Sequence, residues 1–345
     1  MRRVGIIGDG AWGTALALHL DRLGRAVTVW GPFERDVAAV RADRENRRYL
    51  PGFPIPASIG WSADPVEAVA GADAVVMAVP SRHVAQVAAR FALHVAGAAL
   101  AVSVTKGLEP ESGRRMTEVV RTAWTPLPVA ALSGPSFAEE VARGLPAAVV
   151  AASTSPGAAE AVQELFSGDT FRVYTSEDGV GVELGGVLKN VVALAAGASD
   201  ALGFGTNARA ALITRGLAEM TRLGVALGAH PETFSGLSGL GDLVLTCTGP
   251  LSRNRRVGER IGQGESLDAI LSSTPHVAEG VANCETVRAL ARAHGVSTPI
   301  VNMVYRVLFE GVSPQEAVTS LMGREPKPER DARDRPGRFG QEQDT

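Results

Sequence analysis

Three glycines between a short β-rich run and a helical run constrain the fold of this chain more than any other feature. Residues 4–7 are followed at once by Gly8-Asp9-Gly10-Ala11-Trp12-Gly13 and then by an Ala- and Leu-rich stretch that ends near residue 23. A G-x-G-x-x-G sequence in this setting forms a tight turn between a strand and a helix. Its backbone can approach a pyrophosphate, which the N-terminus of the helix then binds. The pattern predicts a dinucleotide site at Gly8, Gly10 and Gly13.

Further β-rich runs indicate the sheet to which the first strand belongs. Helical stretches separate most of these runs, which is typical of a parallel, doubly wound sheet. Ligands of such sheets bind beyond the carboxyl ends of the strands. The runs are residues 27–30, 74–79, 99–104, 129–133, 147–152 and 171–174.

The second half of the chain has helical hydrophobic spacing and no strand alternation from about residue 180 onward. A chain of 345 residues is also long for a single core. We therefore predict a doubly wound α/β domain over residues 1–180 and an all-α domain over residues 181–323. Residues 324–345 are charged and contain prolines, so we expect a disordered tail there.

Composition argues against several classes of partner. A net charge of -3 and an aromatic content of 5% give no reason to expect nucleic acid. A membrane span needs about 20 continuous apolar residues, and none is expected here. Two cysteines, Cys247 and Cys284, are too few for a disulfide framework or a structural zinc site. We expect a cytoplasmic protein without a metal site.

Lys189 is the only charged residue in the run 185–197. On a helix, bulky apolar residues occupy one face of this run, and Lys189 and Asn190 lie among small residues on the other. Burial of an ammonium costs several kcal/mol unless the group is paired, and it lowers the pKa. Such a lysine can act as a base near neutral pH. The alternative is a lysine that extends from the helix flank to solvent.

Asp242 follows a glycine-rich bend at residues 237–241 and precedes an apolar run. Its carboxylate can orient an ammonium such as that of Lys189. It can equally cap the next helix.

Two motifs follow predicted strands. Lys106, in the sequence Thr105-Lys106-Gly107-Leu108-Glu109, can offer positive charge to a phosphate or a carbonyl oxygen, or it can be a solvated charge in a turn. The sequence Ser133-Gly134-Pro135-Ser136-Phe137-Ala138 opens a helix over residues 138–143. The backbone N–H groups and the Ser136 hydroxyl there suit an anion or a hydroxyl group. The alternative is that Ser136 is an ordinary N-cap.

Three arginines begin a helix that runs to about residue 261, in the sequence Ser252-Arg253-Asn254-Arg255-Arg256. Cations at a helix N-terminus oppose its dipole, so they suggest a bound anion or an outside partner. Arg253 can bind two phosphate oxygens at once. The alternative is that the arginines point to solvent or to Glu259.

The end of the second strand bears on the choice of cofactor. NAD-specific sites usually carry Asp or Glu at this position, where it binds the ribose hydroxyls. Gly31 and Pro32 stand here instead. Because these two positions place no carboxylate against a 2′-phosphate, we expect NAD(P)H as cofactor, with a preference for NADPH.

Together these motifs resemble those of the bacterial-type NAD(P)-dependent glycerol-3-phosphate dehydrogenases, over nearly the whole chain up to about residue 323. The resemblance implies a Rossmann-type N-terminal domain, an α-helical C-terminal domain and a cleft between them. It also implies the interconversion of dihydroxyacetone phosphate and sn-glycerol 3-phosphate, which supplies phospholipid synthesis, and a homodimer. The motifs are Gly8-x-Gly10-x-Trp12-Gly13-Thr14-Ala15, Asn46-x-x-Tyr49-Leu50-Pro51, Thr105-Lys106-Gly107-Leu108-Glu109, Leu132 to Ala138, Leu188-Lys189-Asn190, Gly239 to Leu243 and Ser252-Arg253-Asn254.

The resemblance further implies a role for each matching residue, with Lys189 as the general acid/base. Asp9 and Pro32 depart from the family pattern, because a small residue usually stands at the first position and a basic or polar one often stands at the second. The residues expected around the substrate are Lys106, Gly134, Ser136, Lys189, Asn190, Asp242, Ser252, Arg253 and Asn254. Those expected to contact the cofactor, besides the glycine loop with its Ala11 and Trp12, are Tyr49, Lys106, Ala138, Arg253, Val277 and Glu279.

Two other functions remain open at this point. A dehydrogenase of another small hydroxy acid also suits a dinucleotide domain joined to a helical domain, although the arginine motif at residues 252–254 favours a phosphorylated substrate. A dinucleotide-sensing protein without turnover is the second alternative. The lysine in an otherwise uncharged helix argues against it, because a sensor gains nothing from an activated amine.

Overall fold

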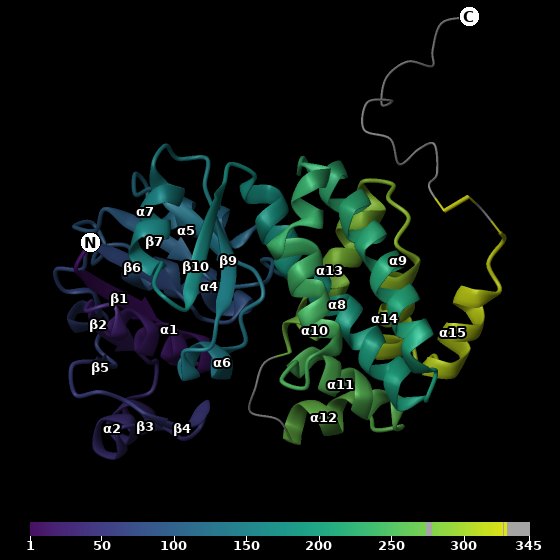
Figure 1. Ribbon diagram of the computed structural model, residues 1–345, viewed down its shortest axis with the longest axis horizontal. Coiled ribbons are helices and arrows are strands. Elements are labelled where there is room, and N and C mark those ends of the chain that lie inside the picture. The colour runs from purple at the N-terminus through teal and green to yellow at the C-terminus, as the bar shows by residue number, and fades with distance from the viewer. Residues whose placement is uncertain (274–277, 327, 330–345) are drawn as a thin grey trace, which may run out of the picture.

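The computed structural model describes residues 1–273, 278–326, 328 and 329. A sheet domain and a helical domain lie side by side, and the chain passes once from the first to the second (Figure 1). The expected fold class, an α/β domain followed by an all-helical domain, is confirmed.

Eight strands form one sheet in the order β10-β9-β8-β7-β6-β1-β2-β5. The central strands β6, β7 and β8 are buried along their whole length, because helices cover both faces of the sheet. The bounds are β1 (Arg3–Ile7), β2 (Ala26–Trp30), β5 (Gly60–Ser62), β6 (Ala74–Met77), β7 (Leu100–Ser103), β8 (Val129–Ser133), β9 (Ala147–Ala152) and β10 (Phe171–Ser176).

The prediction of a fully parallel sheet is wrong at one edge. β9 is antiparallel to β8 and parallel to β10. Between β8 and β9 the chain forms only the six-residue helix α6 (Ala138–Arg143). At 1.5 Å per residue this helix is about 9 Å long, whereas a parallel crossover must return along a strand of about 17 Å. Three further strands were not predicted from the sequence: β5 and the hairpin of β3 (Glu45–Asn46) and β4 (Leu50–Pro54).

The sheet domain has two cores, one on each face. Ile6 and Ile7 are neighbours in β1, yet they belong to different cores because successive side chains of a strand point to opposite faces. One core contains residues of α1 (Ala11–Arg22), α2 (Glu34–Asp43), α6 and α7 (Ala158–Phe166). The other contains residues of α3 (Pro65–Val69), α4 (Ser81–Phe91) and α5 (Met116–Ala123).

The helical domain is built around α8 (Gly179–Ala201), which contacts most of the other helices (Figure 1). α8 is long and apolar enough to span a membrane, but 83% of its apolar window is buried inside the protein, so it is a core helix. The other elements are α9 (Gly205–Ala226), η1 (Pro231–Ser235), η2 (Leu237–Gly241), α10 (Asp242–Thr248), α11 (Arg253–Gly262), α12 (Leu267–Ser273), α13 (Glu279–Ala293), α14 (Pro299–Phe309) and α15 (Pro314–Met322).

Small residues allow the neighbouring helices to approach the backbone of α8. A Cβ on Gly197 would lie 1.9 Å from the carbonyl oxygen of Arg255 in α11. A Cβ on Gly280 of α13 would lie 2.5 Å from the carbonyl oxygen of Asn190. Because no larger side chain fits at these two glycines, α11 and α13 pack directly against the stretch of α8 that carries Lys189 and Asn190.

Candidate active site

The glycine loop after β1 presents open backbone at the start of α1. Gly8 has φ +125°, and a Cβ on it would lie 2.7 Å from the backbone of Ala78. A Cβ on Gly13 would lie 2.0 Å from the carbonyl oxygen of Gly8, whereas no atom lies within 4 Å of such a position on Gly10. No side chain caps the start of α1. These features fit a pyrophosphate held against the Gly10 side of the loop.

The β3–β4 hairpin holds this loop from the side. The buried Asn46 donates hydrogen bonds to the carbonyl oxygen of Asp9 at 2.7 Å and to Oγ1 of Thr14 at 2.9 Å. Tyr49 follows on the same hairpin and packs, partly buried, against the same core as Trp12 and Ala138. The structure therefore brings the predicted cofactor residues of the hairpin, the glycine loop and α6 to one core.

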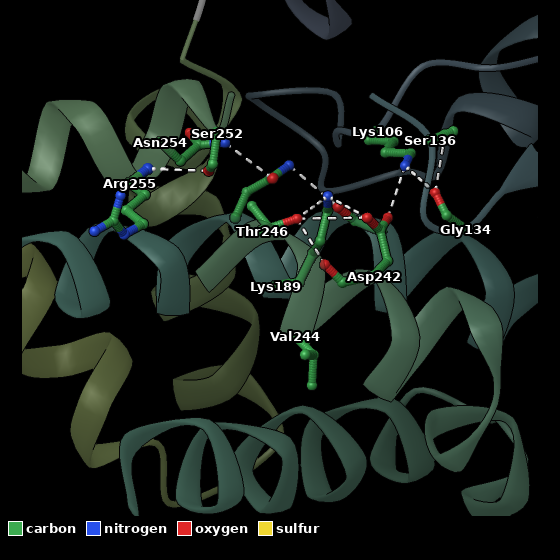
Figure 2. A network of polar contacts seen from close by, with 12 residues as sticks. Lys106, Gly134, Ser136, Lys189, Asp242, Val244, Thr246, Ser252, Asn254 and Arg255 are labelled. Carbon is green, nitrogen blue, oxygen red and sulfur yellow. Dashed lines mark hydrogen bonds and ion pairs between the residues drawn. The ribbon is translucent and has the colours of Figure 1, made fainter. Parts of the chain in front are cut away.

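Lys189, Asp242 and Lys106 meet where the two domains touch (Figure 2). Nζ of Lys189 donates to Oδ1 of Asp242 at 2.7 Å, and Nζ of Lys106 donates to Oδ2 of the same carboxylate at 2.6 Å. Lys189 comes from the middle of α8, Asp242 is the first residue of α10, and Lys106 follows β7. Asp242 orients the ammonium, as one reading of the sequence proposed, and it does not cap α10.

Burial dominates the electrostatics of this cluster. It lowers the pKa of Lys189 to about 8, an effect that Asp242 opposes and Lys106 reinforces. The side chains of Lys189 and Lys106 are 7% and 19% exposed, so both ammonium groups are largely removed from bulk water. Two lysines share one carboxylate, which leaves a surplus positive charge facing the domain junction. Such a site can stabilise an oxyanion and transfer a proton.

Thr246 also belongs to this cluster, although it was not predicted from the sequence. Its Oγ1 accepts a hydrogen bond from Nζ of Lys189 at 2.6 Å and donates one to the carbonyl oxygen of Asp242 at 2.6 Å. Thr246 lies one helical turn after Asp242 on α10. That spacing places the two side chains on the same helix face. The four-residue spacing from Asp242 is therefore the sequence feature that could have identified Thr246.

Gly134 and Ser136 lie on the Lys106 side of the cluster (Figure 2). The carbonyl oxygen of Gly134 accepts from Nζ of Lys106 at 2.8 Å and from Oγ of Ser136 at 3.0 Å. The alternative that Ser136 caps α6 is wrong, because the N-cap is Phe137 and no side chain caps that helix. Ser136 instead helps to fix the loop whose carbonyl group holds Lys106.

Two of the three arginines at the start of α11 are engaged by the fold. Arg255 forms ion pairs with Asp200 at 2.8 Å and with Glu259 at 2.9 Å. Nε of Arg256 donates to the carbonyl oxygen of Pro250 at 3.0 Å. The alternative in which these arginines point to Glu259 is therefore correct for Arg255.

Arg253 differs from both of its neighbours. It is exposed to solvent, and within the part of the chain that the structure describes it makes no hydrogen bond or ion pair. Surrounding protein nevertheless lowers its pKa, an effect that the charge of Glu279 opposes. The guanidinium of Arg253 is thus partly desolvated by nearby protein, and its N–H donors are available to a ligand.

Ser252, Asn190 and Asn254 are committed to contacts within the protein. Oγ of Ser252 accepts from the backbone N–H of Arg255 and so caps α11. Nδ2 of Asn254 donates to Oδ1 of Asn190 at 2.9 Å, and Oδ1 of Asn254 accepts from the backbone N–H of Gly280 at 2.9 Å. The Asn pair therefore joins α8, α11 and α13 beside Lys189.

Glu279 connects the two domains. Its carboxylate accepts from the backbone N–H of Ser81 at 3.0 Å and from the Ser81 hydroxyl at 2.6 Å, at the start of α4. Nδ2 of Asn283 donates to it at 2.9 Å. Glu279, the first residue of α13, therefore binds the start of α4, and its carboxylate already accepts hydrogen bonds from the protein. Val277, the other residue predicted from this segment, lies outside the described residues.

Comparison with known proteins agrees with this order of domains. Residues 3–159 match the family model "NAD-dependent glycerol-3-phosphate dehydrogenase N-terminus", and residues 178–319 match the corresponding C-terminus model. The NAD(P)+ glycerol-3-phosphate dehydrogenase of Anaeromyxobacter dehalogenans is 50% identical over 331 residues, which cover 95% of this chain and 99% of that protein. That of Thioalkalivibrio sulfidiphilus is 50% identical over 327 residues, or 94% and 98%.

Solved structures agree as well. The crystal structure of glycerol-3-phosphate dehydrogenase from Coxiella burnetii superposes with a TM-score of 0.90 at 41% identity, and the match covers 94% of this chain and 99% of that chain. The family expected from the sequence motifs is thereby confirmed. This chain belongs to the NAD-dependent glycerol-3-phosphate dehydrogenase family and is an NAD(P)-dependent oxidoreductase.

Proposed function

We propose that Lys189 is the proton-transfer residue in the reduction of dihydroxyacetone phosphate to sn-glycerol 3-phosphate by this chain. The observation that carries this proposal is the buried Lys189 ammonium, which lies 2.7 Å from Asp242 and whose pKa is lowered to about 8. A lysine with that pKa is present in both protonation states near neutral pH, as a reversible acid/base must be.

The chemistry divides between cofactor and protein. NAD(P)H, when bound, supplies a hydride for C2 of the substrate. Negative charge then develops on the carbonyl oxygen, and the Lys189 ammonium stabilises that oxygen and donates its proton. In the opposite direction the neutral amine of Lys189 removes the hydroxyl proton of glycerol 3-phosphate.

Asp242 and Lys106 influence the position and the protonation state of the Lys189 ammonium. Asp242 holds the ammonium in place and favours its charged form, whereas Lys106 disfavours it. Because Lys106 brings a second positive charge to the same carboxylate, the cluster is electrostatically suited to an oxyanion. Thr246 fixes the direction of the Lys189 ammonium through its accepting hydroxyl.

The substrate phosphate is assigned to Arg253 and the start of α11. Arg253 is the arginine in this segment whose donors are free within the described residues, and a guanidinium can bind two phosphate oxygens. The polar groups of Ser252 and Asn254 lie on the same first turn, and Gly134 and Ser136 lie on the Lys106 side. Phosphate binding at Arg253 would hold C2 in position for hydride transfer.

The cofactor is assigned to the glycine loop, with Trp12, Tyr49 and Ala138 around it. We also propose that the enzyme is cytoplasmic and homodimeric and that it supplies glycerol 3-phosphate for glycerophospholipid synthesis. The family is one of soluble enzymes, which supports the first of these assignments.

Chemical rescue tests the role of Lys189. We expect Lys189→Ala to lose most of its turnover of dihydroxyacetone phosphate and to regain at least about tenfold when ethylamine is added, because a free amine can replace a missing general acid/base. Glu183→Gln is the matched control, since it alters another buried charge on α8 and should not respond to ethylamine. Activity of Lys189→Ala that is near normal, or a loss that ethylamine does not relieve, would count against proton transfer by Lys189.

A further inference from the structure

The end of β2 lacks the usual carboxylate, but a carboxylate from elsewhere occupies the space beside it. β2 ends at Trp30 and is followed by Gly31, Pro32 and Phe33, none of which is charged. A Cβ on Gly31 would lie 2.5 Å from Oδ2 of Asp9. Asp9 stands inside the glycine loop, so its side chain reaches from β1 across to the end of β2. The absence of a side chain on Gly31 leaves the room that the Asp9 carboxylate fills.

The Asp9 carboxylate is available to a ligand. It accepts a hydrogen bond from its own backbone N–H, and no other described residue donates to it. Its backbone carbonyl is fixed by Asn46, which holds the loop in place while the carboxylate retains acceptor capacity. A carboxylate at the end of β2 is the group that binds ribose hydroxyls in dinucleotide folds.

Other charges near Asp9 do not favour an additional phosphate. Asp36 and Arg48 act on Asp9, and they form an ion pair with each other at 2.5 Å. Arg48 is already paired with Asp36, so the charges that act together here, with Asp9 itself, are two carboxylates and one guanidinium. A 2′-phosphate placed there would meet a net negative charge.

We infer that Asp9 determines the cofactor preference of this enzyme: it accepts hydrogen bonds from the adenosine ribose of NADH and repels the 2′-phosphate of NADPH. This inference rests on the cofactor site proposed above. It reverses the preference for NADPH that Gly31 and Pro32 suggested, because that expectation considered only the residues that follow β2.

A test of this inference needs a pH at which Asp9 is in one known protonation state. Burial raises the pKa of Asp9 to about 6, and Asp36 adds to this effect. Above pH 7 the carboxylate is therefore mainly ionised, so it can only accept from a ribose hydroxyl and cannot donate to a phosphate. Measurements at pH 8 satisfy this condition.

Equilibrium binding without substrate tests the inference directly. The full-length protein is titrated at pH 8 with NADH and separately with NADPH, and nicotinamide fluorescence reports the Kd. We expect NADH to bind at least about tenfold more tightly than NADPH, which corresponds to about 1.4 kcal/mol. Asp9→Ala should weaken NADH, tighten NADPH and bring the ratio of the two Kd values close to one. Asp9→Ser is a second small variant in case the first does not fold.

Asp36→Asn is the matched control, because it removes the other carboxylate that acts on this position and leaves Asp9 in place. It should leave the Kd of NADH unchanged, whereas Asp9→Ala should raise it. Equal binding of NADH and NADPH by the wild-type protein, or an unchanged ratio in both Asp9 variants, would overturn the role of Asp9 alone. Wild-type protein that binds neither dinucleotide would overturn the proposed cofactor site and, with it, this inference.

Discussion

Two ionic clusters link α8 to the sheet domain, and they differ in the sign of their surplus charge and in whether that charge reaches solvent. Glu183 accepts hydrogen bonds from the backbone N–H of Thr117 at 2.9 Å, from the Thr117 hydroxyl at 2.5 Å and from Arg115 at 2.8 Å. Arg115 also pairs with Glu118 at 2.6 Å, and the Glu118 side chain is 38% exposed, so the second carboxylate of this cluster reaches solvent while the start of α5 is held against α8. In the second cluster, Lys189 and Lys106 share Asp242, and among the described residues this leaves a largely buried surplus positive charge.

The difference separates a structural site from a reactive one. A buried charge whose hydrogen bonds are all supplied by the fold can hold two elements together, but it has no capacity left for a ligand. A buried surplus positive charge is costly in the isolated protein, and that cost is relieved when an anion or a developing oxyanion arrives. We therefore expect changes in the Glu183 cluster to affect stability and changes in the Asp242 cluster to affect turnover.

The largest effect should come from Asp242→Asn, which leaves Lys189 and Lys106 without a counter-charge. We expect kcat to fall by about 10³-fold, since the position and the charge of the general acid are both disturbed. Asp242 raises the pKa of Lys189, so the pH profile of the residual activity should also move to lower pH. Steady-state kinetics at several pH values measures both quantities.

Circular dichroism provides the control for Asp242→Asn, because an unfolded variant would lose activity for an unrelated reason. A folded variant with unchanged kcat and an unchanged pH profile would show that Asp242 does not control Lys189.

Glu183→Ala should give the opposite result. Removal of Glu183 leaves Arg115 with only the partly exposed Glu118 and takes the buried acceptor away from Thr117, so the free energy of unfolding should fall by about 3 kcal/mol. At a temperature where the variant is folded, kcat should stay close to that of the wild type. Urea denaturation and initial rates on the same sample measure the two effects, and a large loss of kcat with normal stability would contradict the comparison.

Local sequence patterns predicted the parts of the site that depend on local chemistry. The glycine loop has a fixed spacing, and a lone lysine in an apolar helix indicates burial without knowledge of the partner. Lys106 and Asp242 were each predicted near a substrate, and the structure places both on Lys189. These residues can be found because a single segment contains the signal.

Features that depend on contacts between distant segments could not be predicted in this way. The antiparallel β9 is determined by where α6 directs the chain, and the pairing of Arg255 with Asp200 joins two helices. The contact of Asp9 with Gly31 likewise requires the register between β1 and β2, which the sequence motif alone does not specify.

Arg253→Ala extends the comparison to α11, since Arg253 has no hydrogen bond or ion pair with any residue that the structure describes, whereas Arg255 is paired with Asp200. Loss of a bidentate contact to phosphate should raise the KM for dihydroxyacetone phosphate by about 100-fold. The KM for dihydroxyacetone, which has no phosphate, should change little. Equal effects on both substrates would indicate that Arg253 does not bind the phosphate.

The smallest expected effect is the pH dependence that follows from the lowered pKa of Lys189, about 8. Reduction requires the ammonium, so kcat/KM for dihydroxyacetone phosphate should fall as pH rises through this value. Oxidation requires the neutral amine, so kcat/KM for glycerol 3-phosphate should rise, by about tenfold between pH 7 and pH 9. Initial rates in both directions at constant ionic strength would reveal the two opposite slopes.

The variant Lys106→Met tests the electrostatic origin of that pKa. Lys106 disfavours the charged form of Lys189, so its removal should move both profiles to higher pH, whatever its effect on the absolute rates. Glu183 is not among the groups that shift the pKa of Lys189, so Glu183→Gln should leave both profiles in place. Profiles that do not move in Lys106→Met, or that move in Glu183→Gln, would show that the surplus charge at Asp242 is not what adjusts Lys189.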